Sequence, residues 1–141
     1  MTRLRGNGSP ERGGTLIEAA LTMMVFFVII FGIFEFGRLY SIYQMLTDAA
    51  REGARFSVAP FPGTSDLPSD SQVEDQVRGF LNAANVTAIT SVSVTQTVTD
   101  TVNGVDVVFS EVEVTAPYDF LLFPFGDITL AARARMRNET N

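Results

Sequence analysis

The sequence contains no cysteine, histidine or lysine, and all ten of its basic residues are arginines. Without cysteine, the chain can form neither a disulfide framework nor a thiolate metal site. Without imidazole, thiol or amine side chains, the available nucleophiles and general bases reduce to carboxylates and hydroxyls. The sequence pattern places no two acids together as a catalytic pair. We therefore predict that the chain is not an enzyme and that it uses no cofactor, metal or small-molecule substrate.

Charge and proline are both missing from a long stretch near the amino terminus. The sixteen residues Ala19–Phe34 carry no charge, and proline is absent from Thr15 to Ala59. A helix from Thr15 to Val58 would be about 66 Å long. Its apolar part, up to Phe36, would span about 27 Å, close to the thickness of a hydrocarbon core. We predict one membrane-spanning helix that continues beyond the membrane.

The residues that follow this apolar stretch are typical of a membrane anchor that is retained rather than cleaved. A cleaved secretory signal would be shorter and would end in small residues, whereas Phe34-Glu35-Phe36-Gly37-Arg38 follows here. Glu35 and Arg38 are three residues apart, which predicts an ion pair on the helix at the far membrane edge.

Positive and negative charges are unevenly distributed along the chain. Residues 1–13 hold three arginines and one glutamate, whereas residues 14–141 hold seven arginines and fifteen acids. The positive end is expected to stay in the cytoplasm while the acidic remainder crosses. Because no basic stripe is present to neutralise phosphates, we expect no nucleic-acid partner.

An apolar stripe continues along the helix beyond the membrane. Its residues recur at alternating spacings of three and four: Leu39, Ile42, Leu46, Ala49, Gly53 and Phe56. Ala49 and Gly53 are small, so another element can approach the helix closely there. We interpret the stripe as the surface that packs against the protein's own sheet.

A loop rich in proline follows, and then a short second helix. Ser71 followed by Glu74 predicts a capping box. Asn85 is a suitable stop, because asparagine tolerates the left-handed conformation. The predicted apolar face consists of Val73, Val77, Phe80, Leu81 and Ala84.

Two antiparallel strands are predicted next, and their turn leaves two registers open. A two-residue turn at Asn103-Gly104 would place Val98 opposite Phe109. A three-residue loop would place Val98 opposite Val108 and Val94 opposite Val112, so that valine meets valine. We favour the three-residue loop.

The last predicted strand alternates small or apolar residues with arginines. The inward residues are Ile128, Leu130, Ala132, Ala134 and Met136. Arg133, Arg135 and Arg137 point outward, and antiparallel pairing with the middle strand brings arginines across from Glu111 and Glu113. Such pairs contribute about 0.2–1 kcal/mol each, so they favour a register more than they stabilise the fold.

An apolar segment containing a proline precedes this strand and suits neither a central strand nor a solvated loop. We favour a segment that folds back over the open end of the small core. The alternative is a contact surface for a neighbouring subunit or the membrane interface. The segment's apolar residues are Phe120, Leu121, Leu122, Phe123 and Phe125.

Glu18 stands one residue before the uncharged run. A carboxylate costs about 2.5–3.5 kcal/mol at the bilayer centre and less near the edge, so Glu18 is expected to have a partner. The alternative is a glutamate in the first helical turn, which the helix dipole favours.

The stretch Gly13-Gly14-Thr15-Leu16-Ile17-Glu18 after a basic leader resembles the prepilin signal of type IV filament proteins. The resemblance implies a cut by prepilin peptidase between Gly13 and Gly14. It also implies that Glu18, as residue five of the mature chain, meets the new amino terminus of a neighbouring subunit. Two opposite charges in a low-dielectric filament core would select one register.

Residues 14–58 as a whole resemble the TadE-like family, minor pilins or pseudopilins of the tight-adherence system. The resemblance is carried by the leader with Glu18, by the exit motif Glu35, Gly37 and Arg38, and by the packing motif at residues 49–55. The packing motif comprises Ala49, Arg51, Glu52, Gly53 and Arg55. The resemblance implies a bacterial inner-membrane protein that works with other pilin subunits and pilus assembly proteins and that can be extracted into a pilus.

Together these features predict an α+β, pilin-like fold: a long helix, a short helix and a three-stranded antiparallel sheet. We divide the chain into a leader (1–13), a transmembrane and extended helix (14–58) and an extracytoplasmic domain (59–141). An ordinary type IV pilin or secretion pseudopilin is the near alternative, because Thr15-Leu16-Ile17-Glu18 is closer to those proteins. A membrane-anchored binding module that keeps its leader is the alternative of another class.

Overall fold

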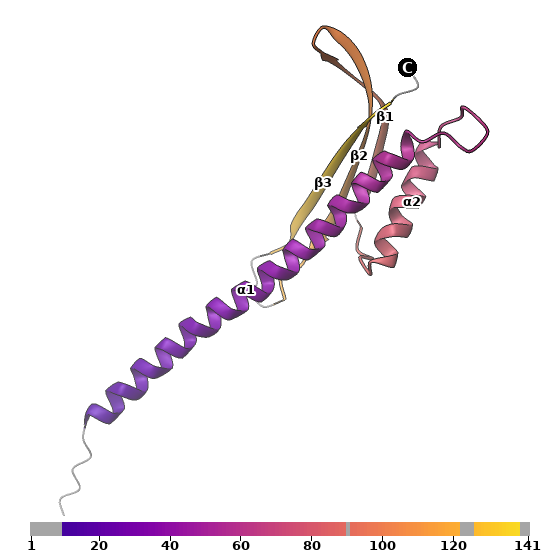
Figure 1. Ribbon diagram of the computed structural model, residues 1–141. Helices are drawn as coiled ribbons and strands as arrows, with labels where there is room; N and C mark the ends of the chain where they lie inside the picture. The colour runs from indigo at the N-terminus through magenta and orange to yellow at the C-terminus, as the bar shows by residue number, and fades with distance from the viewer. Residues whose placement is uncertain (1–9, 90, 122–125, 139–141) are drawn as a thin grey trace, which may run out of the picture. The chain divides into compact units, whose positions relative to one another are not determined.

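The computed structural model describes residues 10–89, 91–121 and 126–138, and the chain divides into two compact units, Met1–Gly37 and Arg38–Asn141 (Figure 1). A long apolar helix, a short helix and three antiparallel strands follow one another along the sequence. The predicted α+β fold is confirmed.

Helix α1 spans Pro10–Ser57, so it begins before Thr15, the predicted start. Residues 10–13 of the predicted leader therefore belong to the helix. Proline fits the first turn of a helix, because its fixed φ is helical and it has no N–H to satisfy. Residues 1–9 of the predicted leader lie outside the described residues.

The first unit exposes its large apolar side chains. Ile17 is 73% exposed and Phe34 is 70% exposed, and most large apolar residues between them are exposed too. In the described part of the chain, α1 is the one helix long and apolar enough to cross a membrane. A helix that is apolar all round fits a lipid environment, so α1 fits single-pass membrane anchoring.

Helix α2 spans Asp70–Ala83, and its capping box lies two residues earlier than predicted, at Ser69 and Gln72. The Gln72 side chain accepts a hydrogen bond from the Ser69 N–H at 2.9 Å, and Ser69 Oγ accepts one from the Gln72 N–H. Ser71 and Glu74 match the same spacing, but a start at Ser69 extends the helix by two residues. Asn85 adopts the expected left-handed conformation, with φ of 61°.

Strands β1 (Ser91–Val102), β2 (Val105–Tyr118) and β3 (Ile128–Arg137) form a sheet in the order β1-β2-β3. Asn103 and Gly104 both have positive φ and make the two-residue turn that sequence reasoning rejected. Val94 lies opposite Val112, as predicted, but Val98 lies opposite Phe109 rather than Val108. A β-bulge between Thr95 and Val98 absorbs one residue, and both pairings are therefore satisfied in the same hairpin.

Polar side chains from both strands at the bulge, Gln96 on β1 and Ser110 on β2, bond to residues at or beside the ends of the helices. Gln96 Nε2 donates to the Pro68 carbonyl at 2.7 Å, next to the start of α2. The buried hydroxyls of Ser57, at the end of α1, and Ser110, on β2, lie 2.6 Å apart. These bonds satisfy polar groups that burial would otherwise make costly.

The arginines of β3 pair with the glutamates of β2, as predicted. Arg133 lies opposite Glu113, with 2.9 Å between Nη2 and Oε2, and Arg135 donates to Glu111. Arg135 also lies 3.7 Å from a carboxylate oxygen of Asp100 on β1. The pairs link all three strands on the outer face of the sheet.

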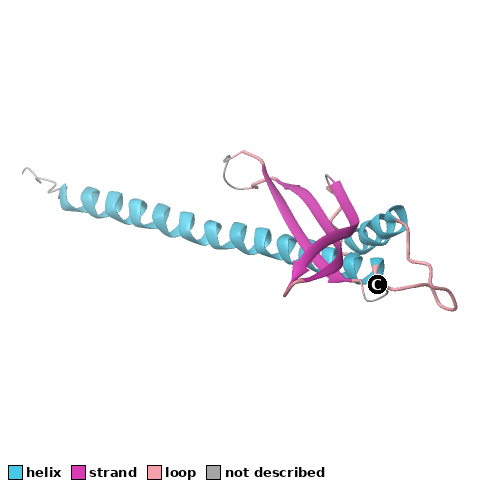
Figure 2. Cartoon of the chain, turned by 90° about the horizontal axis from the view of Figure 1, so that it is seen from above, coloured by secondary structure: helices cyan, strands magenta, loops and turns pink. Residues whose placement is uncertain are grey.

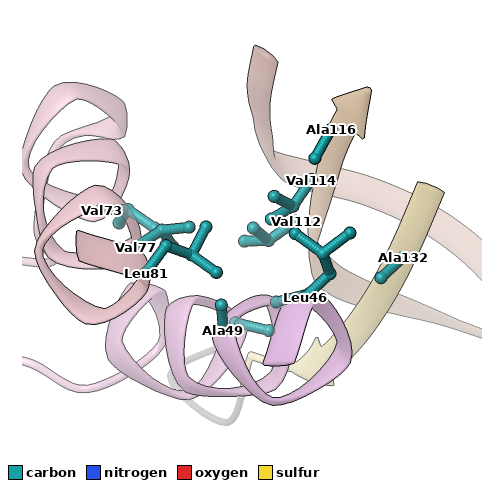
Figure 3. Packing of buried hydrophobic residues seen from close by; sticks show 11 residues of the cluster. Leu46, Ala49, Val73, Val77, Leu81, Val112, Val114, Ala116 and Ala132 are labelled. Atoms are coloured by element: carbon teal, nitrogen blue, oxygen red, sulfur yellow. The ribbon is translucent and has the colours of Figure 1, made fainter. Parts of the chain in front are cut away.

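The core of the second unit lies where α1, α2 and the sheet meet (Figures 2 and 3). Figure 3 shows side chains of α2, α1 and β2 pointing toward one another. The fully buried apolar residues include Leu46, Ala49, Ala50, Ala54, Val73, Val77, Leu81, Val112 and Val114. The interpretation that the α1 stripe packs on the protein's own sheet is confirmed, and α2 shares the same surface.

Gly53 is the point of closest approach in this core. A Cβ added at Gly53 would lie 2.4 Å from Val77 Cγ2 on α2 and 3.3 Å from Val112 Cγ1 on β2. Real Cβ atoms do not approach other carbons to 2.4 Å, so any side chain here would push α1 away from both neighbours.

We predict that Gly53→Ala lowers the free energy of unfolding by about 1–3 kcal/mol through overpacking. Gly79→Ala is the matched control, because no atom lies within 4 Å of a Cβ at Gly79 on α2. Alanine there is expected to raise stability by about 0.5–1 kcal/mol. Urea denaturation of the full chain in detergent, followed by circular dichroism, measures both. Equal midpoints for the two variants would contradict the close packing at Gly53.

Candidate functional site

Glu18 lies on the exposed apolar surface of the first unit. Leu16, Ile17 and Leu21 around it are all largely exposed. Thr22 Oγ1 donates to the backbone carbonyl of Glu18 at 2.9 Å, but among the described residues none pairs with the Glu18 carboxylate. Burying an unpaired carboxylate in an apolar environment is costly, so the expectation that Glu18 has a partner stays a prediction.

Gly13 and Gly14 both lie in the first turns of α1, and no described atom lies within 4 Å of a Cβ built on either residue. Glycine in a helix costs about 0.5–1 kcal/mol relative to alanine. Packing within the described structure therefore gives no reason for a glycine pair at this position.

The exit motif is divided between the two units. Glu35 and Gly37 belong to the first unit and Arg38 begins the second. The predicted ion pair between Glu35 and Arg38 stays a prediction.

Arg38 makes contacts that sequence reasoning missed. Its guanidinium carbon lies 4.3 Å from the centre of the Tyr118 ring, and its Nη2 donates to the Asp119 carbonyl. The ring of Phe120 packs edge-on against Tyr118, with 5.2 Å between centroids. These contacts fasten the end of β2 to the start of the second unit. The sequence does contain one indication of these contacts. Arg38 follows an apolar span, and an arginine in such a place is expected to have a polar or aromatic neighbour.

The packing motif at residues 49–55 has two faces. Ala49 and Gly53 are buried in the core. Arg55 donates two hydrogen bonds to Glu52, at 2.8 and 3.1 Å, and Arg51 lies 3.8 Å from Asp48.

These ion pairs lie on the outer side of α1. The hydrogen bonds from Arg55 hold the pKa of the Glu52 carboxyl below its usual value. Because the pair is largely exposed to water, it adds little stability. The motif therefore contributes to the fold through its small residues, while its charged residues are left on the surface.

The predicted apolar segment after β2 is described only in part. Phe120 is half-buried against Tyr118, whereas Leu121 is 73% exposed. Leu122, Phe123 and Phe125 lie outside the described residues.

A groove of about 410 Å³ opens beside Arg38 in the second unit. Residues of α1, the loop after α2 and the end of β2 line it. The lining includes Arg38, Ile42, Met45, Tyr118 and Leu121. The described residues contain no cluster of acids that could hold a metal ion.

The family model of TadE-like proteins matches residues 13–55. The predicted resemblance is confirmed, and the match supports a Tad pilus-associated protein. It begins at Gly13, includes Glu18 and the exit motif, and ends at Arg55, the last residue of the packing motif. No curated protein and no solved structure gives a significant match to the chain.

We predict that Arg38→Met lowers the free energy of unfolding by about 1–2 kcal/mol, because it removes the contact with Tyr118 and the hydrogen bond to Asp119. Arg55→Met is the matched control: its side chain is 68% exposed, and its loss is expected to change stability by less than about 0.5 kcal/mol. Thermal unfolding of the full chain in detergent compares them. A larger loss for Arg55→Met would show that the Arg38 contacts do not stabilise the unit.

Proposed function

We propose that the chain is a TadE-like minor pilin or pseudopilin, a structural component in the assembly of a tight-adherence pilus. The observation that carries the proposal is the family match over residues 13–55, which covers the glycine pair, Glu18 and both helix motifs. The role is structural, with no catalysis, cofactor or small-molecule substrate. Its partners are prepilin peptidase, other pilin or pseudopilin subunits and pilus assembly proteins.

The glycine pair supports processing by prepilin peptidase between Gly13 and Gly14. Nothing in the described packing calls for glycine at these positions, although two glycines weaken a helix start. A peptidase that binds the backbone closely at this point would explain why glycine is present there despite its cost to the helix. The cut would remove Arg3, Arg5 and Arg12, and with them the basic leader.

Cutting after Gly13 would create a new ammonium group on Gly14, four residues before Glu18. The resemblance to type IV filament proteins implies that the partner of the Glu18 carboxylate is the amino terminus of a neighbouring subunit. An ion pair in a low-dielectric surrounding is strong only at close range and good geometry. It would therefore fix the axial register between helices whose apolar surfaces could otherwise slide.

The proposed pilin role also implies an orientation of the chain in the membrane. The amino terminus would lie in the cytoplasm and the acidic second unit outside the inner membrane, in line with the positive-inside rule. Extraction of the apolar helix into a pilus would exchange lipid contacts for contacts with other subunits. Because both environments are apolar, the exposed surface of the first unit suits either one.

We predict that Glu18→Ala and Glu18→Gln leave membrane insertion intact but lower the amount of the chain in sheared fibres at least tenfold, or about 1.4 kcal/mol. Both variants remove the charge that would pair with the neighbouring amino terminus. Quantitative immunoblots of membrane and fibre fractions from the native host give the measurement.

Glu52→Gln is the control, because its carboxylate lies outside the apolar span and is already paired with Arg55. Incorporation of Glu52→Gln should match that of the unaltered chain. If Glu18→Ala also reached fibres at the unaltered level, the proposed role of Glu18 would be refuted.

A further inference from the structure

The second unit exposes large aromatic and aliphatic side chains near its first residue. Tyr40 is 53% exposed, Tyr43 is 42% exposed and Leu121 is 73% exposed. The proposed pilin role assigns no task to the two tyrosines. Large exposed apolar groups gathered in one region commonly mark a binding surface.

Leu121 is held at the same level of α1 as Arg38. Arg38 donates to the Asp119 carbonyl and lies over the Tyr118 ring, and the Phe120 ring packs on Tyr118. Arg38 and Leu121 also line the same groove. The chain after β2 is therefore fastened beside the first turn of the second unit.

This level lies close to the end of the apolar span. Arg38 is separated from Phe36 by one residue, and two chain steps reach at most about 7 Å. Tyr40 and Tyr43 lie about 3 and 8 Å further along α1. The headgroup region on each side of a bilayer is about 5–8 Å thick. At about 1.5 Å per residue, Tyr40 lies about 6 Å beyond Phe36 and within this region, whereas Tyr43 lies about 10 Å beyond Phe36 and just outside it. Helical side chains lean toward the amino terminus, so the Tyr43 side chain is directed back toward the headgroups.

The exposed groups lie on two opposite sides of α1. Arg38, Ile42 and Met45 line the groove on the side covered by the end of β2, where Leu121 also lies. Tyr40 and Tyr43 are three residues apart and share the other side of the helix, which turns about 100° per residue. A protein partner would cover one side of the helix. Apolar and aromatic groups on both sides suit a planar boundary, and tyrosine is enriched at membrane interfaces.

We propose that Tyr40, Tyr43 and Leu121 form an interfacial ring that seats the second unit on the lipid headgroups. The ring inserts by apolar and aromatic contact, since the one nearby cation, Arg38, is already bound to Asp119 and Tyr118. Binding therefore needs no anionic lipid. The proposal rests on the membrane span alone and is independent of leader cleavage and of Glu18.

The absence of tryptophan from the chain makes a direct test available. Tyr43→Trp and Leu121→Trp each introduce a single indole into the full chain, reconstituted in phosphatidylcholine vesicles. Phe61→Trp is the matched control: Phe61 is 37% exposed and follows the end of α1, which lies about 29 Å along the helix from Arg38.

Lipids brominated near the headgroup end of the acyl chain should quench both ring indoles at least about twofold more than the control indole, because only interfacial groups meet the bromines. Vesicles with added anionic lipid should give the same ratio. A third reporter, Tyr40→Trp, replaces either variant whose circular dichroism melt departs from that of the unaltered chain.

Quenching of the ring indoles no stronger than that of Phe61→Trp would overturn the proposal. A second result would also overturn it. If bromolipids did not quench the ring indoles, and if added pilus proteins protected these indoles from aqueous acrylamide, the surface would bind a protein partner instead.

Discussion

The structure of the second unit depends on the close approach of α1 to α2 and β2 at Gly53. A side chain at this position would overlap Val77 and crowd Val112, so the absence of a Cβ sets the distance between three elements. Ala49, Ala50 and Ala54 extend the same tight contact along the helix. Because protein interiors are packed as densely as organic crystals, these small residues let Leu46, Leu81 and Val112 meet in one core.

The same helix meets two environments, and the size of its apolar residues changes between them. In the first unit the apolar residues are large and exposed, as in Ile17 and Phe34, which suits lipid or neighbouring helices. In the second unit the buried face of α1 combines Leu46 with the small residues Ala49, Ala50 and Ala54. Arg38 stands at the change, and its contacts with Tyr118 and Asp119 fasten the end of β2 there. The charged residues of the packing motif lie on the outer side of α1, whereas Ala49 and Gly53 face the core.

Patterns with a period could be predicted from the sequence, and features decided by one residue could not. The stripe on α1, the Glu and Arg partners on β2 and β3, and the left-handed Asn85 follow from spacing and residue type. The hairpin register failed because a bulge between Thr95 and Val98 satisfies two pairings that looked exclusive. The capping box failed because two serines fit one spacing. The position of Glu18 could be predicted from the sequence, but no described residue pairs with its carboxylate, so the chain alone does not identify the proposed partner.

Removal of the leader is the step on which the pilin account rests, because without it the amino terminus that should pair with Glu18 does not exist. The most direct measurement is the intact mass of the protein recovered from membranes of its native host, combined with amino-terminal sequencing. The account predicts a chain that begins at Gly14, with or without a methyl group. A chain that still begins at Met1 or Thr2 would contradict it, and Glu18 would then be a helix-start residue of a membrane-anchored binding domain.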